Sequence, residues 1–128
     1  MKKIILLIIC LACYNIINAQ WQWARGVGGS GVNEGLSVAT DESGNCFCTG
    51  AFFSPSVTFG ATTLNNTGGY DFFLAKYDGS GNALWARSAV GTGGDVAYSV
   101  TTGISGNAFV TGYFNSPTIT FGPITLTN

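Results

Sequence analysis

Residues 43–52 read Ser-Gly-Asn-Cys-Phe-Cys-Thr-Gly-Ala-Phe, and residues 105–114 read Ser-Gly-Asn-Ala-Phe-Val-Thr-Gly-Tyr-Phe, so one segment occurs twice, 62 residues apart. The same offset extends in both directions without a gap. Residues 23–66 align with residues 85–128, and 23 of the 44 aligned positions are identical. The chain is therefore built from tandem units, of which the second is partial.

Alternating apolar and polar residues, bounded by Gly, Asn and Pro, predict strands throughout the repeat. In the first unit these strands cover residues 36–40, 46–52, 71–77 and 83–88, and in the second unit residues 98–102 and 108–114. Residues 57–59 and 119–121 are extended insertions after the second strand of each unit. Four strands per unit predict the antiparallel blade of a β-propeller. The expected fold is all-β, with about one and a half to two four-stranded antiparallel blades of an incomplete β-propeller, preceded by a signal-peptide helix.

The first 19 residues have the order of a secretory signal peptide. Lys2 and Lys3 precede an apolar run over residues 4–13, and a more polar region ends at Ala19. This order predicts export and cleavage after Ala19. A lipid-modified Cys10 or Cys13, or a retained anchor helix, remains an alternative. The expected organisation is a signal peptide over 1–19 and a repeat region over 20–128. Within that region the first unit covers about 23–84, and a partial second unit covers 85–128.

The charge of the mature chain excludes several classes of partner. After cleavage three basic residues remain against six acidic ones, which gives a net charge of −3. No basic patch is available for phosphates, so nucleic acid and anionic membrane surfaces are disfavoured. The chain contains no His, the residue most often used for acid–base catalysis.

The second unit removes most candidate sites, because it replaces their residues. Cys46 and Cys48 align with Ala108 and Val110, so we interpret the two thiols as small packing groups. The adjacent carboxylates at 41–42 align with Gly-Ile, and we interpret them as a solvated turn. The loop at residues 78–82 reads Asp-Gly-Ser-Gly-Asn. Its alternating oxygen donors allow a calcium site or a hairpin turn, and Gly with Asn favours the turn. We predict no catalytic, metal-binding or cofactor-binding residue.

Aromatic side chains are the best candidates for contacts with a partner. Trp23 and Trp85 occupy equivalent positions, and we expect both to pack between blades. Recurring phenylalanines are assigned to the core: Phe47 and Phe109, Phe52 and Phe114, Phe59 and Phe121. Three aromatic residues have no aromatic counterpart in the other unit, and we predict that they form surface contacts: Trp21, Tyr70 and Tyr113.

The repeat resembles the bacterial SBBP family of β-propeller repeats. Four motifs carry the resemblance: residues 71–78 (Asp-Phe-Phe-Leu-Ala-Lys-Tyr-Asp), 81–87 (Gly-Asn-Ala-Leu-Trp-Ala-Arg), 93–95 (Gly-Gly-Asp) and 105–112 (Ser-Gly-Asn-Ala-Phe-Val-Thr-Gly). The resemblance covers nearly all of the mature chain. It implies an exported or cell-surface protein with many units and no shared catalytic residues.

Two hypotheses on function follow. The first is a non-catalytic exported module, a scaffold or a protein- or glycan-binding surface within a larger secreted or cell-surface protein. Its expected partners are further blades, other copies of itself, or an extracellular protein or glycan, and it needs no cofactor. The alternative is a fragment of an extracellular propeller hydrolase whose catalytic residues lie in other blades. Either way, we expect a marginally stable or aggregation-prone chain, because a blade buries its faces only against neighbours.

Overall fold

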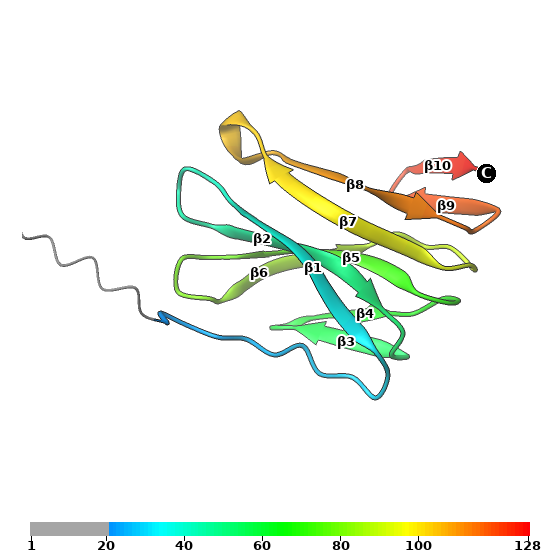
Figure 1. The fold of residues 1–128 in the computed structure, drawn as a ribbon, viewed down its shortest axis with the longest axis horizontal. Coiled ribbons are helices and arrows are strands. Elements are labelled where there is room, and N and C mark those ends of the chain that lie inside the picture. Colours follow the sequence, from blue (N-terminus) through cyan, green and yellow to red (C-terminus); the bar gives the residue numbers. More distant parts are fainter. Residues whose placement is uncertain (1–20) are drawn as a thin grey trace, which may run out of the picture.

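The structure is a computed structural model, and it describes residues 21–128. The predicted signal peptide and the lipidation alternatives at Cys10 and Cys13 lie outside the described residues. The described residues form ten strands and one short 3₁₀ turn (Figure 1). The strands are β1 (Asn33–Thr40), β2 (Cys46–Phe52), β3 (Ser56–Phe59), β4 (Thr62–Asn65), β5 (Asp71–Tyr77), β6 (Ala83–Ser88), β7 (Asp95–Thr102), β8 (Ala108–Phe114), β9 (Thr118–Phe121) and β10 (Ile124–Thr127), with the 3₁₀ turn at Ile104–Gly106.

The first unit contains the predicted four-stranded antiparallel sheet. Its strand order is β1-β2-β5-β6, and every neighbouring pair is antiparallel. The sheet runs from Asn33 to Ser88. It therefore begins ten residues after Trp23, the first residue of the Trp-Ala-Arg motif with which the aligned repeat starts. That motif forms part of the outer strand β6 when it recurs at residues 85–87. The earlier copy, at residues 23–25, lies in irregular chain beside the sheet.

A hairpin formed by β3 and β4 is inserted between the second and third strands of the sheet. In Figure 1 this hairpin lies below β5 and β6, apart from the four strands of the sheet. It buries its apolar side chains against the sheet: Val57, Phe59 and Leu64 from the hairpin, Phe52, Phe73, Ala75, Tyr77 and Ala86 from the sheet. Alternation along β5 places every second side chain in this cluster. The inserted β3–β4 hairpin therefore builds the main core together with the sheet.

The second unit repeats the pairing of the first. Strands β7 and β8 pair antiparallel, with Val100 opposite Val110 as Val38 is opposite Cys48. Even the irregularity recurs, since the register shifts between Gly35 and Ser37 in β1 and between the equivalent residues of β7. Strands β9 and β10 form the second copy of the inserted hairpin. The offset of 62 residues in sequence is thus also an offset in structure.

The two units stack on each other. Strand β7 lies against β1, β2 and β5, which places the second unit over one face of the first sheet (Figure 1). The described residues form several small antiparallel sheets and no closed barrel. Each sheet is packed by its neighbour and by its own inserted hairpin. This is the arrangement that a stack of repeats requires, because one unit cannot bury both of its faces.

Candidate binding surfaces

The first sheet has two faces with different coverings. One face carries Cys46, Cys48 and Phe52 and is covered by the β3–β4 hairpin; we call it the hairpin face. The other carries Phe47 and Thr49 and is covered in part by β7; we call it the stacking face. The second sheet has the same two faces, and its hairpin face points toward the stacking face of the first. Candidate sites can therefore lie on an open face or between the sheets.

A cavity of about 330 Å³ lies on the hairpin face of the first sheet, beside the irregular segment that precedes β1. Trp23 stacks on Tyr77 there, with ring centroids 5.8 Å apart, and Arg25 donates from Nε to the carbonyl oxygen of Gly81 at 2.7 Å. Trp23 therefore packs on the sheet of its own unit, and the prediction that it packs between two blades is wrong. Its counterpart Trp85 lies on the stacking face, where it meets Phe47 edge-on at 6.0 Å.

Both cysteines line this cavity as free thiols. They pack against the apolar core, as the alignment with Ala108 and Val110 predicts. Burial raises the pKa of both thiols, and for Cys48 the nearby Cys46 adds to the effect. A raised pKa keeps the thiols protonated at neutral pH, so they are poor nucleophiles and poor metal ligands. No group of three His, Cys, Asp or Glu residues in the described chain is arranged to hold a metal ion.

A second and larger cavity of about 600 Å³ lies between the two units. Its floor is the stacking face of the first sheet, including Phe72 and Leu74 of β5 and Arg87 of β6. Its roof belongs to the second unit: Val110, Phe114, Ile119, Phe121 and Leu126 are among its lining residues. Most of this lining is apolar, which suits an apolar occupant better than a polar or charged one.

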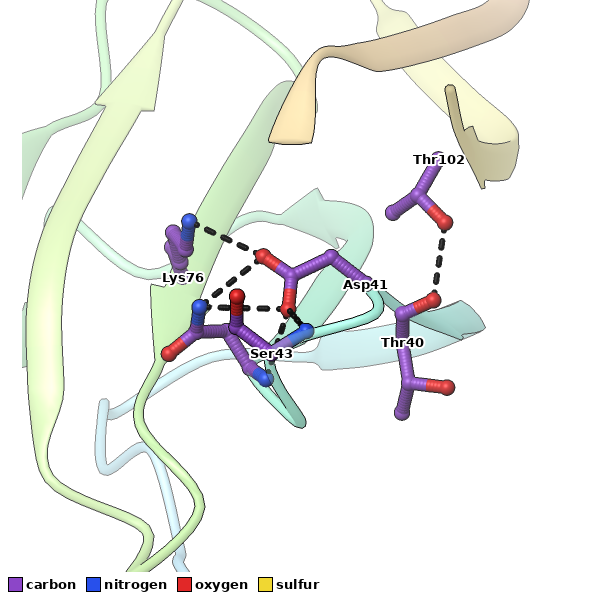
Figure 2. Close-up of polar contacts among 6 residues, drawn as sticks. Thr40, Asp41, Ser43, Lys76 and Thr102 are labelled. Carbon is purple, nitrogen blue, oxygen red and sulfur yellow. Dashed lines mark hydrogen bonds and ion pairs between the residues drawn. The ribbon is translucent and has the colours of Figure 1, made fainter. Parts of the chain in front are cut away.

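An ion pair on the stacking face joins the first β-turn to strand β5. Lys76 Nζ lies 3.2 Å from Asp41 Oδ2 (Figure 2). The same ammonium lies 4.7 Å from the centre of the Phe47 ring. Asn45 donates to both Asp41 oxygens from its side-chain amide, at 3.1 and 2.9 Å. The hydrogen bonds from Asn45, and secondarily the charge of Lys76, lower the pKa of Asp41 to about 2.

The prediction of a solvated turn is wrong for Asp41 and right for Glu42. Glu42 is exposed, whereas only 6% of the Asp41 side chain is accessible. The covering comes from the second unit, since a Cβ atom built on Gly106 would lie 3.7 Å from Asp41 Oδ2. The stacking of the units, which a turn sequence does not reveal, therefore buries this carboxylate.

The loop at residues 78–82 is a tight turn between β5 and β6, as the hairpin interpretation predicts. Asp78 Oδ1 accepts hydrogen bonds from the backbone N–H groups of Ser80 and Asn82, at 2.9 Å each. Gly81 has a φ of 79°, a left-handed conformation that favours glycine. The hydrogen bonds from Asn82 lower the pKa of Asp78. The Asp78 carboxylate thus accepts hydrogen bonds from residues of its own turn.

Two buried carboxylates lie where the chain passes from the first unit to the second. Asp95 is held by Ser116, whose Oγ lies 2.8 Å from Asp95 Oδ2. Asp71 Oδ2 accepts from the backbone N–H of Thr67 at 2.7 Å, while its Oδ1 has no hydrogen-bond partner within residues 21–128. Burial raises the pKa of Asp71, and the charge of Asp95 adds to the rise. A buried carboxylate with an unpaired oxygen is costly when ionised.

The three predicted surface aromatics lie on three separate segments. Trp21 is 94% exposed in the irregular segment before β1. Tyr70 precedes β5 and is half-buried against Phe53, with ring centroids 5.3 Å apart. Tyr113 lies on β8 and is exposed. The structure therefore does not bring these three residues into one site.

Tyr113 belongs instead to an aromatic surface that sequence reasoning missed in part. Its ring lies 5.7 Å from that of Tyr98 on β7, and Phe109 is 61% exposed on β8. The assignment of Phe109 to the core is wrong, because the face that buries its counterpart Phe47 is supplied by the next unit in the stack. Phe47 itself is 1% exposed beneath β7. We call Tyr98, Phe109 and Tyr113 the aromatic face.

The described residues contain no helix that is long and apolar enough to cross a membrane.

An uncharacterized WD repeat-containing protein of Acanthamoeba polyphaga mimivirus is similar to the chain, with 32% identity over 105 residues. The matched region is 77% of this chain, which spans only 8% of the length of that relative. No protein-family model and no solved structure matches the chain. The similarity is thus to a repeat protein, in agreement with the internal repeat.

Proposed function

We propose that the chain is a non-catalytic repeat module of the β-propeller type, which acts as a scaffold and presents a binding surface. The recurrence of strand register, including its bulge, in two stacked units carries the proposal. Stacked repeats create extended surfaces rather than enclosed active sites. The similarity to a WD repeat-containing protein supports a repeat module.

The binding surface is the aromatic face of the second sheet. Tyr98, Phe109 and Tyr113 are 57%, 61% and 48% exposed, so three large rings are open to solvent on adjacent strands. Aromatic side chains supply much of the binding energy at protein interfaces. The occupants we propose are further blades, or an extracellular protein or glycan, in an exported protein of the SBBP type.

Export is tested by expressing the full chain in a bacterium and sequencing the N-terminus of the secreted or surface-bound product. A new N-terminus at Gln20 supports export with signal cleavage, whereas an uncleaved cytoplasmic product overturns that part of the proposal. Labelling with radioactive palmitate separates a secreted product from one lipidated at Cys10 or Cys13.

Binding is tested by screening the mature chain against a defined array of glycans and extracellular proteins. The double variant Tyr98→Ala and Tyr113→Ala is expected to lose at least tenfold in affinity for any ligand found. Leu84→Ala is the matched control, because Leu84 is 52% exposed on the edge strand of the other sheet. A ligand that binds the double variant as tightly as the parent excludes the aromatic face.

A further inference from the structure

Strand β8 leaves open one of its two edges, and the equivalent edge of its counterpart β2 is paired with β5. In the first sheet β2 lies between β1 and β5. Strand β8 is paired with β7 alone among the described residues. The residues of β2 are mostly buried, while those of β8 are mostly exposed. The edge of β8 that faces away from β7 is therefore open to a further strand, because the two strands have the same register with their first partners.

The cavity between the units is the volume that such a neighbour would fill. In the first unit Phe73, Ala75 and Tyr77 of β5 pack against the hairpin, and Phe59 lies 5.0 Å from Phe73. The counterpart of Phe59, Phe121, lines the cavity and is 38% exposed, against 2% for Phe59. Leu126 is 45% exposed, against 8% for its counterpart Leu64. The hairpin of the second unit packs in part on the first sheet, where the Phe121 ring lies 5.5 Å from that of Phe72, and it leaves apolar surface open toward the cavity.

We propose that the free edge of β8 and the 600 Å³ cavity beneath it bind an added antiparallel strand of the β5 type, supplied by another repeat unit. This inference rests on the proposed repeat module and names its partner and docking site. The occupant carries an acidic residue first, a large aromatic third, a small residue fifth and Tyr seventh, as β5 does. The last three side chains enter the cavity, and the backbone extends the sheet.

The repeat also fixes the register of the added strand. In the first unit Gly50 lies opposite Phe73 and Cys48 opposite Ala75. The equivalent positions on β8 are Gly112 and Val110, so the aromatic third residue lies opposite Gly112. Thr111 stands where Thr49 stands, and the Thr49 hydroxyl donates to the carbonyl oxygen of Phe73 at 2.5 Å. Thr111 thus provides a ready donor for the incoming backbone.

The experiment adds a fluorescent peptide with the sequence of residues 70–78 to the full chain and follows its anisotropy. Saturable binding is expected for this peptide and not for a scrambled peptide of the same composition. Two further peptides carry N-methyl groups on alternate residues, in two complementary sets. Because alternate N–H groups of an edge strand point to opposite sides, only one set faces β8 and abolishes binding. Equal binding of both sets overturns the proposal.

A pair of variants places the peptide on the protein. Val110→Lys puts an ammonium group at the edge of the cavity and is expected to weaken peptide binding at least tenfold. Val90→Lys is the matched control, since Val90 is 56% exposed and does not line the cavity. Both valines are partly exposed, so neither change is expected to unfold the chain, which circular dichroism verifies. An unchanged affinity in Val110→Lys overturns the docking site.

The result separates this inference from the proposed function. A folded chain that binds no peptide overturns the docking site, while ligand capture by the aromatic face still supports the module. A concentration-dependent dimer in analytical ultracentrifugation that Val110→Lys abolishes and the peptide does not displace would overturn the inference in favour of a second copy at the edge.

Discussion

The hydroxyl of Thr102 donates a hydrogen bond to the carbonyl oxygen of Thr40, its own counterpart one repeat earlier, at 2.8 Å (Figure 2). A second bond of this kind lies two residues away, where the N–H of Val100 donates to Ser37 Oγ at 3.2 Å. Strand β7 therefore lies along β1 in nearly matching register. The stack of units is thus fixed by polar contacts between equivalent strands as well as by apolar packing.

Replacing Thr102 by Val tests this contact. The change keeps the shape of the side chain and removes the donor to the Thr40 carbonyl. We expect the free energy of unfolding to fall by about 0.5–1.5 kcal/mol, the range for one hydrogen bond. Urea titration of the variant measures the fall. Thr101→Val is the control, because Thr101 is exposed on the same strand, and an equal loss there would assign the effect to β7 rather than to the bond.

The carboxylate of Asp41 makes stability depend on pH in the acidic range. Its pKa is lowered from 3.8 to about 2 by Asn45 and Lys76. Because the pKa is lower in the folded than in the unfolded state, the ionised carboxylate stabilises the fold above about pH 4. This stabilisation is lost as the pH falls toward 2. In Asp41→Asn we expect this part of the acid dependence to disappear. Urea titrations of parent and variant between pH 2 and 7 give the difference.

Glu42→Gln is the control for this titration, because Glu42 is the exposed neighbour in the same turn. If Asp41→Asn and Glu42→Gln behave alike, the contacts of the Asp41 carboxylate with Asn45 and Lys76 do not contribute measurably to folding.

The repeat made much of the fold predictable. Residues 46–52, 71–77 and 83–88 form strands with the bounds expected from their alternation. The role of residues 57–59 as an insertion was also correct, although its second strand, β4, was not foreseen. Residues 62–65 are short and rich in Thr, and only pairing with β3 reveals them as a strand.

Burial was predictable only where it arises within one unit. Phe52 and Phe59 are buried by their own hairpin, as expected for core residues. Phe109, Phe121 and Asp41 were misassigned because their surroundings depend on the stacking of units. Phe109 lacks a covering sheet, whereas Asp41 gains one. An internal repeat in the sequence identifies equivalent positions, but it does not show which copy is covered by the sheet of another unit.

The turn at residues 103–107 differs in conformation from its counterpart at residues 41–45, and it begins with Gly103 in place of Asp41. The other two tight turns begin with Asp41 and Asp78, whose carboxylates accept the N–H groups of the turn. Gly103 offers no such acceptor. Here the chain forms a 3₁₀ turn in which Ser105 adopts a φ of 70°. All three Gly-Asn segments, at residues 41–45, 78–82 and 103–107, were correctly predicted as turns. The different conformation of the third was not predicted.

Asp71 gives the opposite pH dependence to Asp41. Thr67 Oγ1 lies 3.0 Å from Asp71 Oδ2 and 2.6 Å from the carbonyl oxygen of Gly91, and its single proton serves one acceptor at a time. Burial and the facing carboxylate of Asp95 raise the pKa of Asp71 above 3.8. The folded state then binds more protons than the unfolded state, so the stability contributed by Asp71 falls as the pH rises through this range.

Asp71→Asn removes that penalty, and the stability of the variant relative to the parent should grow as the pH rises from about 3 to 7. Guanidinium titrations at several pH values measure the difference. Asp78→Asn is the control, because the pKa of Asp78 is lowered and its difference from the parent should change in the other direction. A constant offset between Asp71→Asn and parent would show that Asp71 titrates as an exposed carboxyl does.

Gly50 is required by the bulge in β1. A Cβ atom at this position would overlap the carbonyl oxygen of Glu34, where the register of β1 shifts. Gly112 meets the carbonyl oxygen of Val96 in the same way. Gly50→Ala is expected to destabilise the chain by about 1–3 kcal/mol, as overpacking does. Thermal unfolding measures the loss, and Gly26→Ala, with open space around it, should leave the midpoint nearly unchanged.

The free edge of β8 should also govern the solubility of the chain. Strand β8 offers an exposed, mostly apolar strand with an unpaired side among the described residues, and such edges promote association between copies. We expect light scattering of the parent to rise with concentration and temperature before a cooperative transition is complete. Val110→Lys should suppress this scattering, because a charged side chain on an edge strand opposes pairing, while Val90→Lys should not. Equal scattering of parent and Val110→Lys would place the aggregating surface elsewhere, with the aromatic face as the next surface to vary. A soluble monomer with a cooperative transition in the parent would contradict the expected marginal stability altogether.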